Sequence, residues 1–454
     1  MNRDLKSRTW SLWTHLAIAL GFCHLFPVQA QEQSAAALPA TERKLTLAEA
    51  RRTAFERNWD LLAARSEVEL AVAQKIVSRE FPNPTLSLST LKINTDGQPS
   101  HTVLGNDVWH RNYDSIAAIN QLFEIGGKRS SRKASANAGF DAAKSRLMDA
   151  RRILDAGVGR AYVAALLAQS NVEILKQSAA SLRKEAQIAE TRLKAGDISA
   201  ADKSQIEVDA DRLELDAKTA QGTATAARVA VEVLMGEMNP RGIWVPGDSL
   251  NELAVSSARA TSLRPGTLRP DLAAATADLK KADADLRLQK AMRIPDPTAL
   301  VQYEREPPDQ PNTIGVGLSF PLPLWNQNKG AIKSAQATRD QAQIQLDRLR
   351  AQVAAEIVTS EIDFNNASER WDRYQNQIQP NSEKVRKSVA FAYEKGGASL
   401  VDLLTAQRTD NEIRLATAQA EADSAAAAIT LTAARNVLSE IAREARNPDV
   451  PPKK

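Results

Sequence analysis

Two copies of one short pattern carry the residues with the clearest chemical potential in this sequence. Both have the spacing Gly-x-x-Ser-x-x-Asp and lie 200 residues apart: Gly196, Ser199 and Asp202, then Gly396, Ser399 and Asp402. The chemistry open to the two carboxylates is electrostatic. An aspartate stabilises the positive end of a helix.

Residues suited to catalysis or metal binding are sparse elsewhere. Beyond residues 1–30 the only histidines are His101 and His110, which lie in one polar loop with no cysteine to join them. We therefore expect no functional metal site. The sequence shows no Ser/His/Asp or Cys/His arrangement and no phosphate-binding glycine loop. We expect neither an enzyme nor a cofactor.

The repeated pattern is typical of the tip of a helical hairpin. Glycine adopts the left-handed conformation that ends one helix, and serine three residues later is a good N-cap for the next. The arms before both tips have apolar residues seven apart, which predicts left-handed coiled coils. The first such series runs from Leu147 to Ala189, and the second from Ile357 to Ala392 with Pro380 as a local kink.

Composition supports a mainly helical protein. The chain has 454 residues with Lys+Arg 59 and Asp+Glu 55, is 43% hydrophobic and is only 5% aromatic. Residues 1–30 have the charged start, apolar run and small-residue end of a cleaved signal peptide. That segment holds half of the net positive charge and the only cysteine, Cys23. We therefore expect no nucleic-acid partner, disulfide or lipid anchor.

Each half of the chain repeats one order of elements: a helix, two strands and a long helical hairpin. We expect a first helix from Thr46 to Arg79, and a long arm from Ser130 to Lys194 flanked by two shorter helices stacked end to end. Alternating apolar residues predict four strands. They span residues 86–93, 113–123, 299–304 and 313–320.

The predicted fold is mainly α with a small β part, and its organisation has five segments. These are a signal peptide (1–30), a first repeat (31–235, tip at 195–199), an irregular equatorial collar (236–268), a second repeat (269–443, tip at 395–399) and a flexible C-terminal tail (444–454). Four strands are too few to close a membrane barrel, which needs at least eight. Two, three or four copies would suffice, and spacing alone does not choose between them.

Several of these features together resemble the TolC-type outer-membrane efflux proteins. They are the signal peptide, the duplicated order of elements, Phe123-Glu-Ile-Gly-Gly-Lys-Arg129, Phe320-Pro-Leu-Pro-Leu-Trp-Asn326, and Tyr393 three residues before the second tip glycine. The resemblance implies a homotrimer in the outer membrane of a Gram-negative bacterium. It further implies a 12-stranded transmembrane β-barrel and a periplasmic α-barrel of helical hairpins. A periplasmic membrane-fusion adaptor and, through it, an inner-membrane RND-type pump are the implied partners.

The Gly-Gly-Lys-Arg turn and the Pro-Leu-Pro-Leu-Trp-Asn segment further resemble the cobalt–zinc–cadmium resistance branch. That resemblance implies an exit duct for divalent heavy-metal cations such as cobalt, zinc, cadmium or nickel. Two alternatives stay open from sequence alone. The same duct can serve multidrug efflux or type I secretion, or the chain can be a periplasmic coiled-coil adaptor that spans no membrane.

The resemblance also assigns roles to residues of the two tips. Asp202, Asp402 and Tyr393 correspond to residues at the closed periplasmic end of the tunnel, although both aspartates can equally serve only as helix N-terminal groups. Ala398 stands where some relatives have a gate arginine, so Lys194 or Lys395 would have to substitute. The tip glycines and serines form the turns, with adaptor docking as a second role: Gly196, Ser199, Gly396 and Ser399.

Overall fold

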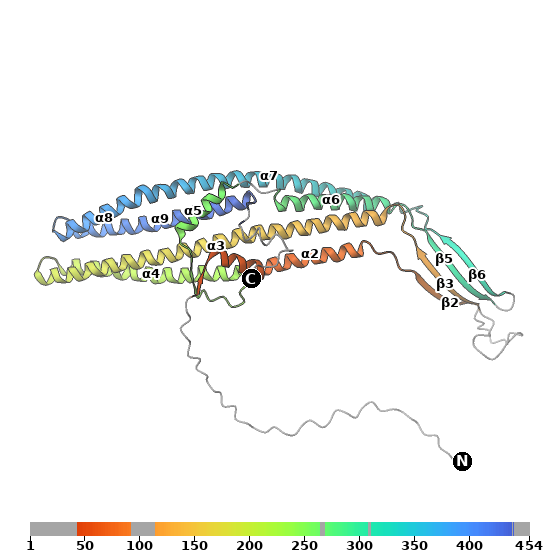
Figure 1. Ribbon diagram of the computed structural model, residues 1–454, viewed down its shortest axis with the longest axis horizontal. Coiled ribbons are helices and arrows are strands. Elements are labelled where there is room, and N and C mark those ends of the chain that lie inside the picture. The colour runs from red at the N-terminus through yellow and green to blue at the C-terminus, as the bar shows by residue number, and fades with distance from the viewer. Residues whose placement is uncertain (1–42, 92–113, 264–267, 307–309, 438, 440–454) are drawn as a thin grey trace, which may run out of the picture. The chain divides into compact units, whose positions relative to one another are not determined.

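The computed structural model describes residues 43–91, 114–263, 268–306, 310–437 and 439 (Figure 1). The predicted signal peptide, His101, His110 and the predicted tail lie outside these residues. The elements of the first half are β1 (Arg43–Leu45), α1 (Leu47–Arg57), α2 (Trp59–Val77), β2 (Thr85–Leu91), β3 (Asp114–Leu122), α3 (Lys128–Ala195) and α4 (Ala200–Leu234). Then follow β4 (Trp244–Pro246), α5 (Leu250–Thr261), α6 (Pro270–Ala291), β5 (Thr298–Glu306), β6 (Gln310–Ser319), α7 (Lys329–Arg373), η2 (Tyr374–Ile378), α8 (Gln379–Glu394) and α9 (Leu400–Ala434).

Helix α3 is the longest element and packs against helices from both halves. Its 68 residues span about 100 Å at ~1.5 Å per residue. The predicted seven-residue spacing lies along its contacts, since Leu154, Ala168, Leu175, Leu182 and Ala189 are all buried. The coiled-coil prediction is confirmed for this arm. None of the helices in the described ranges is both long enough and apolar enough to cross a membrane.

Helices α4 and α2 meet end to end beside α3, as the sequence predicted (Figure 1). The side chain of Asn58 donates a hydrogen bond to the Leu234 carbonyl at 3.0 Å and accepts one from the Leu61 amide at 3.0 Å. Asn58 therefore caps α2 and holds the last turn of α4. The prediction of one continuous helix from Thr46 to Arg79 is wrong at this point, because Asn58 ends α1 and begins α2.

The second arm differs from α3 at its centre. The Gln379 amide donates to the Tyr374 carbonyl, five residues back, so Tyr374–Ile378 form one π-helical turn just before Pro380. Proline has no N–H to donate, and the wider turn accommodates that loss. The exposure of the apolar residues that lie seven apart changes at this turn. Phe364 and Trp371 are partly buried, whereas Ile378 is 38% exposed and Val385 is 57% exposed.

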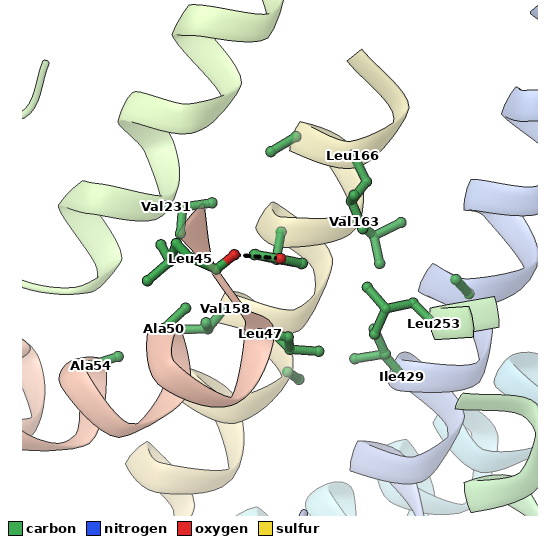
Figure 2. Close-up of a cluster of buried hydrophobic side chains, with 14 of the residues drawn as sticks. Leu45, Leu47, Ala50, Ala54, Val158, Val163, Leu166, Val231, Leu253 and Ile429 are labelled. Carbon is green, nitrogen blue, oxygen red and sulfur yellow. Dashed lines mark hydrogen bonds between the residues drawn. The ribbon is translucent and has the colours of Figure 1, made fainter. Parts of the chain in front are cut away.

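The collar segment contains more regular structure than predicted. Strand β4 pairs in parallel with β1, and Ser249 begins α5 with a capping box completed by Glu252. Leu45 of β1 lies in the buried hydrophobic cluster shown in Figure 2, and Tyr162 of α3 holds the small sheet in place. Its hydroxyl donates to the Leu45 carbonyl at 2.7 Å and its ring stacks on Trp244 at 5.9 Å. A three-residue strand has no period to recognise, so its sequence gave no signal.

Four strands form one antiparallel sheet in the order β2-β3-β5-β6, close to the predicted ranges. Strands β3 and β5 pair across the two halves of the chain, with Ile119 opposite Val301. One run of large apolar side chains is strongly exposed on the outer strand β6: Ile314 at 80%, Val316 at 82% and Leu318 at 66%. Strands β2 and β6 are the edges of the sheet within the chain.

The Gly-Gly-Lys-Arg turn joins the sheet to the helices. Gly126 and Gly127 have φ of 70° and 78°, and a Cβ on Gly126 would lie 2.9 Å from the Ile294 side chain. Lys128 is buried and pairs with Asp296 at 2.7 Å while donating to the Ile294 carbonyl. Arg129 donates to the Arg79 carbonyl at the end of α2. The turn thus holds the ends of α2 and α6 at the start of α3.

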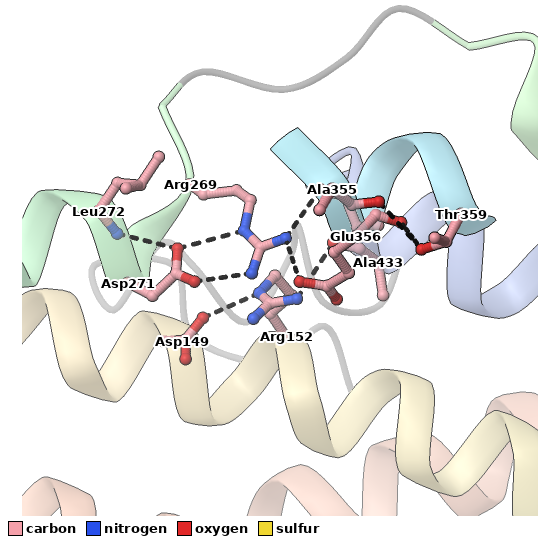
Figure 3. Close-up of polar contacts among 10 residues, drawn as sticks. Asp149, Arg152, Arg269, Asp271, Leu272, Ala355, Glu356, Thr359 and Ala433 are labelled. Atoms are coloured by element: carbon pink, nitrogen blue, oxygen red, sulfur yellow. Dashed lines mark hydrogen bonds and ion pairs between the residues drawn. The ribbon is translucent and has the colours of Figure 1, made fainter. Parts of the chain in front are cut away.

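Ion pairs around two buried arginines fix the end of α9 (Figure 3). Arg152 of α3 donates to the Ala433 carbonyl at 3.2 Å and pairs with Asp149 at 2.8 Å. Arg269 donates to the Ala434 carbonyl and pairs with Asp271 and with Glu356 of α7. Burial raises the pKa of Asp149, against the effect of Arg152. Four helices therefore meet through two guanidinium groups at the negative end of α9.

We predict that Lys128→Met destabilises the protein by about 3 kcal/mol, because it removes the cation from a buried pair and leaves Asp296 charged. The measurement is the thermal unfolding midpoint, followed by circular dichroism in detergent. Lys395→Met is the matched control, since Lys395 pairs with its exposed neighbour Glu394 and an exposed pair contributes little. Equal shifts in the two variants would contradict the role of the Lys128 pair.

Candidate functional site at the two hairpin tips

The two tips have the same backbone geometry. Gly196 and Gly396 have φ of 82° and 78°, which only glycine adopts without strain. The Asp197 amide donates to the Arg192 carbonyl at 2.9 Å, and the Gly397 amide donates to the Ala392 carbonyl at 2.8 Å. These are the long bonds of a Schellman turn. The repeat seen in the sequence is thus a repeat of hydrogen bonds.

Both predicted serine caps are present. Ser199 Oγ accepts from the Asp202 amide at 3.1 Å, and Asp202 Oδ2 accepts from the Ser199 amide at 3.2 Å. Ser399 and Asp402 form the same capping box at 3.2 and 3.0 Å. The Ser399 hydroxyl also donates to Asp402, and this bond, with the backbone bond, lowers the pKa of Asp402. Asp402 is exposed, so its charge faces solvent within this chain.

Tyr393 is almost fully buried, at 6% exposure, beside the first hairpin. The guanidinium of Arg192 lies 5.0 Å from its ring centroid, and Arg192 Nη1 donates to the Tyr393 carbonyl at 3.4 Å. Burial raises the pKa of Tyr393; Arg192 opposes this shift, and the charges of Asp202 and Glu185 add to it. The buried hydroxyl has no hydrogen-bond partner among the described residues. Tyr393 therefore packs between the hairpins, near Asp202.

Beside Tyr393, the cation that contacts the opposite hairpin is Arg192, which our sequence reasoning did not single out. Lys194 and Lys395 instead form ion pairs with Glu190 and Glu394 of their own helices. The 200-residue offset places Arg192 one residue before the position equivalent to Tyr393. The sequence therefore indicates how far Arg192 lies from the end of its hairpin. It does not indicate which face of α3 meets α8. That depends on the packing of the two hairpins.

An apolar cluster holds the two tips together. Leu182, Ala186 and Ala189 of α3 and Ile206 and Ala210 of α4 are all at most 7% exposed. Leu400 and Leu404, in the first turns of α9, pack against this cluster. The first turn that carries Asp402 is thus fixed to the first hairpin, because its leucines are partly buried there.

A buried charge fixes the second hairpin below its tip. Asp410 of α9 is 3% exposed and lies 3.0 Å from both Arg386 of α8 and Arg414 of α9. The Ser382 hydroxyl also donates to it, at 3.1 Å. Among the described residues no group of three or more His, Cys, Asp or Glu side chains is placed to hold a metal ion.

Comparison with known proteins assigns this architecture. The family model described as "Outer membrane efflux protein" matches residues 50–237 and 267–437, which include both tips and all four strands of the large sheet. The chain belongs to this outer membrane efflux protein family. This efflux protein is therefore an outer-membrane component of an export system, not an enzyme.

Individual relatives agree over nearly the whole length. The cobalt-zinc-cadmium resistance protein CzcC of Cupriavidus metallidurans is 26% identical over 411 residues, which is 89% of this chain and 94% of CzcC. The structure of the Vibrio cholerae outer membrane protein VceC matches with a TM-score of 0.68 at 18% identity, over 86% of this chain and 95% of VceC. The Campylobacter jejuni CmeC outer membrane channel matches with a TM-score of 0.69 at 16% identity, over 88% of each chain. The predicted chain fold, mainly helical with long hairpins and four strands, is confirmed.

We predict that Gly396→Ala destabilises the second tip by about 1–2 kcal/mol, because alanine at positive φ is strained. A Cβ there meets no other atom within 4 Å, so the effect is purely conformational. Hydrogen exchange of the amides around the tip measures it. Gly222→Ala is the control: Gly222 lies inside α4, also with nothing within 4 Å, so alanine there should stabilise by up to about 1 kcal/mol. Changes of the same sign in both variants would disprove the turn argument.

We predict a pH-dependent contribution from Asp402. Its folded pKa is lowered below the ordinary 3.8, so its stabilising effect is complete above that value and disappears as pH falls through the folded pKa. Asp402→Asn should therefore lower the unfolding midpoint at about pH 7, and this difference should shrink as pH falls below the ordinary pKa of 3.8. Asp347→Asn, which removes an exposed carboxylate of α7, is the control. A midpoint difference that persists in acid would contradict the assignment.

Proposed function

We propose that this efflux protein is the outer-membrane exit duct of a tripartite system that exports divalent heavy-metal cations. Cobalt, zinc, cadmium and nickel are the proposed substrates. The observation that carries this substrate class is the similarity to a cobalt-zinc-cadmium resistance protein along 94% of that protein's length. The match also covers 89% of this chain.

We propose that three copies of the chain assemble. Within one chain the sheet has two open edges, β2 and β6, and three copies would supply the strands of a closed 12-stranded barrel. The helices also leave apolar side chains uncovered on α2 and α7. Leu70 and Ile76 are 62% and 60% exposed, and Ile344 and Val358 are 68% and 55% exposed. Neighbouring copies would cover these faces.

The tips are the proposed periplasmic gate. Asp202 and Asp402 would recur around the axis of the trimer, so six carboxylates would surround one narrow opening. The lowered pKa of Asp402 keeps its charge across the physiological pH range. Tyr393 and Arg192 join the two hairpins of each copy at this level. The gate would therefore favour cations over anions.

The exposed tips are also the proposed docking point for a periplasmic membrane-fusion adaptor. Gly196, Ser199, Gly396 and Ser399 are all exposed, although their backbones are fixed by the turns. An inner-membrane RND-type pump would act through that adaptor. Selection among metals then belongs to the pump, and the duct passes the cation that it receives.

We predict that a strain lacking this gene is more sensitive to cobalt, zinc, cadmium or nickel, and that the intact gene restores growth. Growth across a series of concentrations of each metal measures this, beside a panel of dyes and antibiotics. Sensitivity to the dyes and antibiotics alone would refute the metal assignment and favour a multidrug duct.

We predict that Asp402→Asn lowers the cation selectivity of the purified protein in planar bilayers, since it removes half of the proposed carboxylates at the opening. The reversal potential across a salt gradient is the measurement. The control is again Asp347→Asn, which changes the same charge far from the tips. Unchanged selectivity and single-channel current in the Asp402 variant would remove Asp402 from the gate.

A further inference from the structure

The apolar pattern of β6 continues beyond the end of the strand. Strand β6 ends at Ser319, yet every second residue stays large and apolar through the next five positions. The exposed fractions of these side chains stay high, at 56% for Phe320, 65% for Leu322 and 64% for Leu324. Trp325 then ends the series at 94% exposure. We call residues 320–325 the anchor loop.

Two prolines explain why these side chains stay exposed. Pro321 and Pro323 alternate with the apolar residues, and a residue that precedes proline is held in extended conformation. The loop can therefore not coil to cover its own leucines. In addition, the Leu324 amide donates to the Leu322 carbonyl at 2.9 Å, which fixes the turn before Trp325.

The backbone around the anchor loop is firmly held. Asn328, at φ 57°, donates through its side chain to the Gln289 carbonyl of α6 at 2.8 Å. On the neighbouring connection, the Phe123 amide donates to the Pro297 carbonyl and the Ile125 amide donates to Asp296. Hydrogen bonds therefore hold the backbone on both sides of the exposed apolar side chains.

Aromatic rings and cations lie together at the same junction of sheet and helices. Phe81 is 69% exposed, with the Arg129 guanidinium 3.9 Å from its ring centroid. Phe123 is 52% exposed. Lys329 and Lys333, in the first turns of α7, are exposed. Exposed aromatic rings beside basic residues are typical of the headgroup layer of a membrane, where a ring has apolar and hydrated surroundings at once.

We propose that the anchor loop lies in the headgroup layer of the membrane, on the helical side of the sheet, with Trp325 at the interface. The occupant of this surface is lipid, and the exposed lysines favour anionic headgroups. The argument rests on the proposed outer-membrane function and on the continuity of the loop with the apolar face of β6. The loop would attach the chain to the membrane through its side chains.

Tryptophan fluorescence tests the proposal. The full-length protein is reconstituted in vesicles of phosphatidylethanolamine and phosphatidylglycerol, and the emission of Trp325→Phe is subtracted from that of the original protein. We expect lipids brominated near the headgroup to quench the difference signal more than twofold better than lipids brominated near the chain ends. Trp59→Phe is the control, because Trp59 is 51% exposed on α2, away from the loop, and its difference signal should not respond to brominated lipid.

Two results would overturn the proposal. Quenching of the Trp325 signal only by acrylamide in the water phase would place the loop outside the membrane. Shielding from both acrylamide and bromolipid would show that another copy of the chain covers it. In either case, a protein that inserts and conducts ions would keep the proposed function. Failure of the original protein to enter vesicles at all would refute that function as well.

A double variant tests the leucines separately. Leu322→Ser with Leu324→Ser should reduce the fraction of protein recovered with floated vesicles at least twofold, without changing the helical circular dichroism signal. Leu215→Ser is the control, because Leu215 is 66% exposed on α4, far from the sheet. Equal recovery of the double variant and the control would contradict a membrane contact of the loop.

Discussion

Close packing along α3 is the constraint on which the rest of the structure depends. This helix contacts α1, α2, α4, α5, α6 and α9, and most of its buried positions are alanine, valine or another small residue. At Gly159 a Cβ would lie 3.1 Å from the Arg51 side chain and 3.2 Å from Ile429, so two helices approach the backbone there directly. Small side chains allow six helices to pack closely against α3. Larger ones would separate the collar from the hairpins.

Charged side chains then bind the backbone groups at the helix ends, which packing alone leaves without partners. The ends of α2 and α6 receive the cations of the Gly-Gly-Lys-Arg turn, and the end of α9 receives Arg152 and Arg269. In each place a guanidinium or ammonium group satisfies carbonyls at the negative end of a helix. The same principle acts at the tips with the opposite sign, where Asp202 and Asp402 meet the amides of α4 and α9. Charged side chains thus neutralise the C-terminal ends of α2, α6 and α9 and the N-terminal ends of α4 and α9.

The features that the sequence predicted are those set by local chemistry. Glycine and serine at the tips, alternation in the four strands and the seven-residue spacing of α3 each act within a few residues, so each could be recognised without the fold. Asn58, Arg192 and the β1–β4 pair could not, because their partners lie far along the chain. The cation at the tips shows the difference well. The position of Arg192 along α3 followed from the repeat. The side of α3 that meets the other hairpin depends on how the two hairpins pack.

The π-helical turn at Tyr374–Ile378 has a consequence for the symmetry of the two halves. A π turn adds about one residue to its helix, which rotates everything beyond it by about 100° relative to an unbroken helix. Beyond this point, residues seven apart no longer face the neighbouring helix. This accounts for the exposure of Val385 after the partly buried Trp371. The two hairpin tips have the same turn geometry, but the helix faces that lead to them are rotated differently. In a ring built from alternating hairpins, the grooves on either side of α8 would differ in shape and in the side chains that line them.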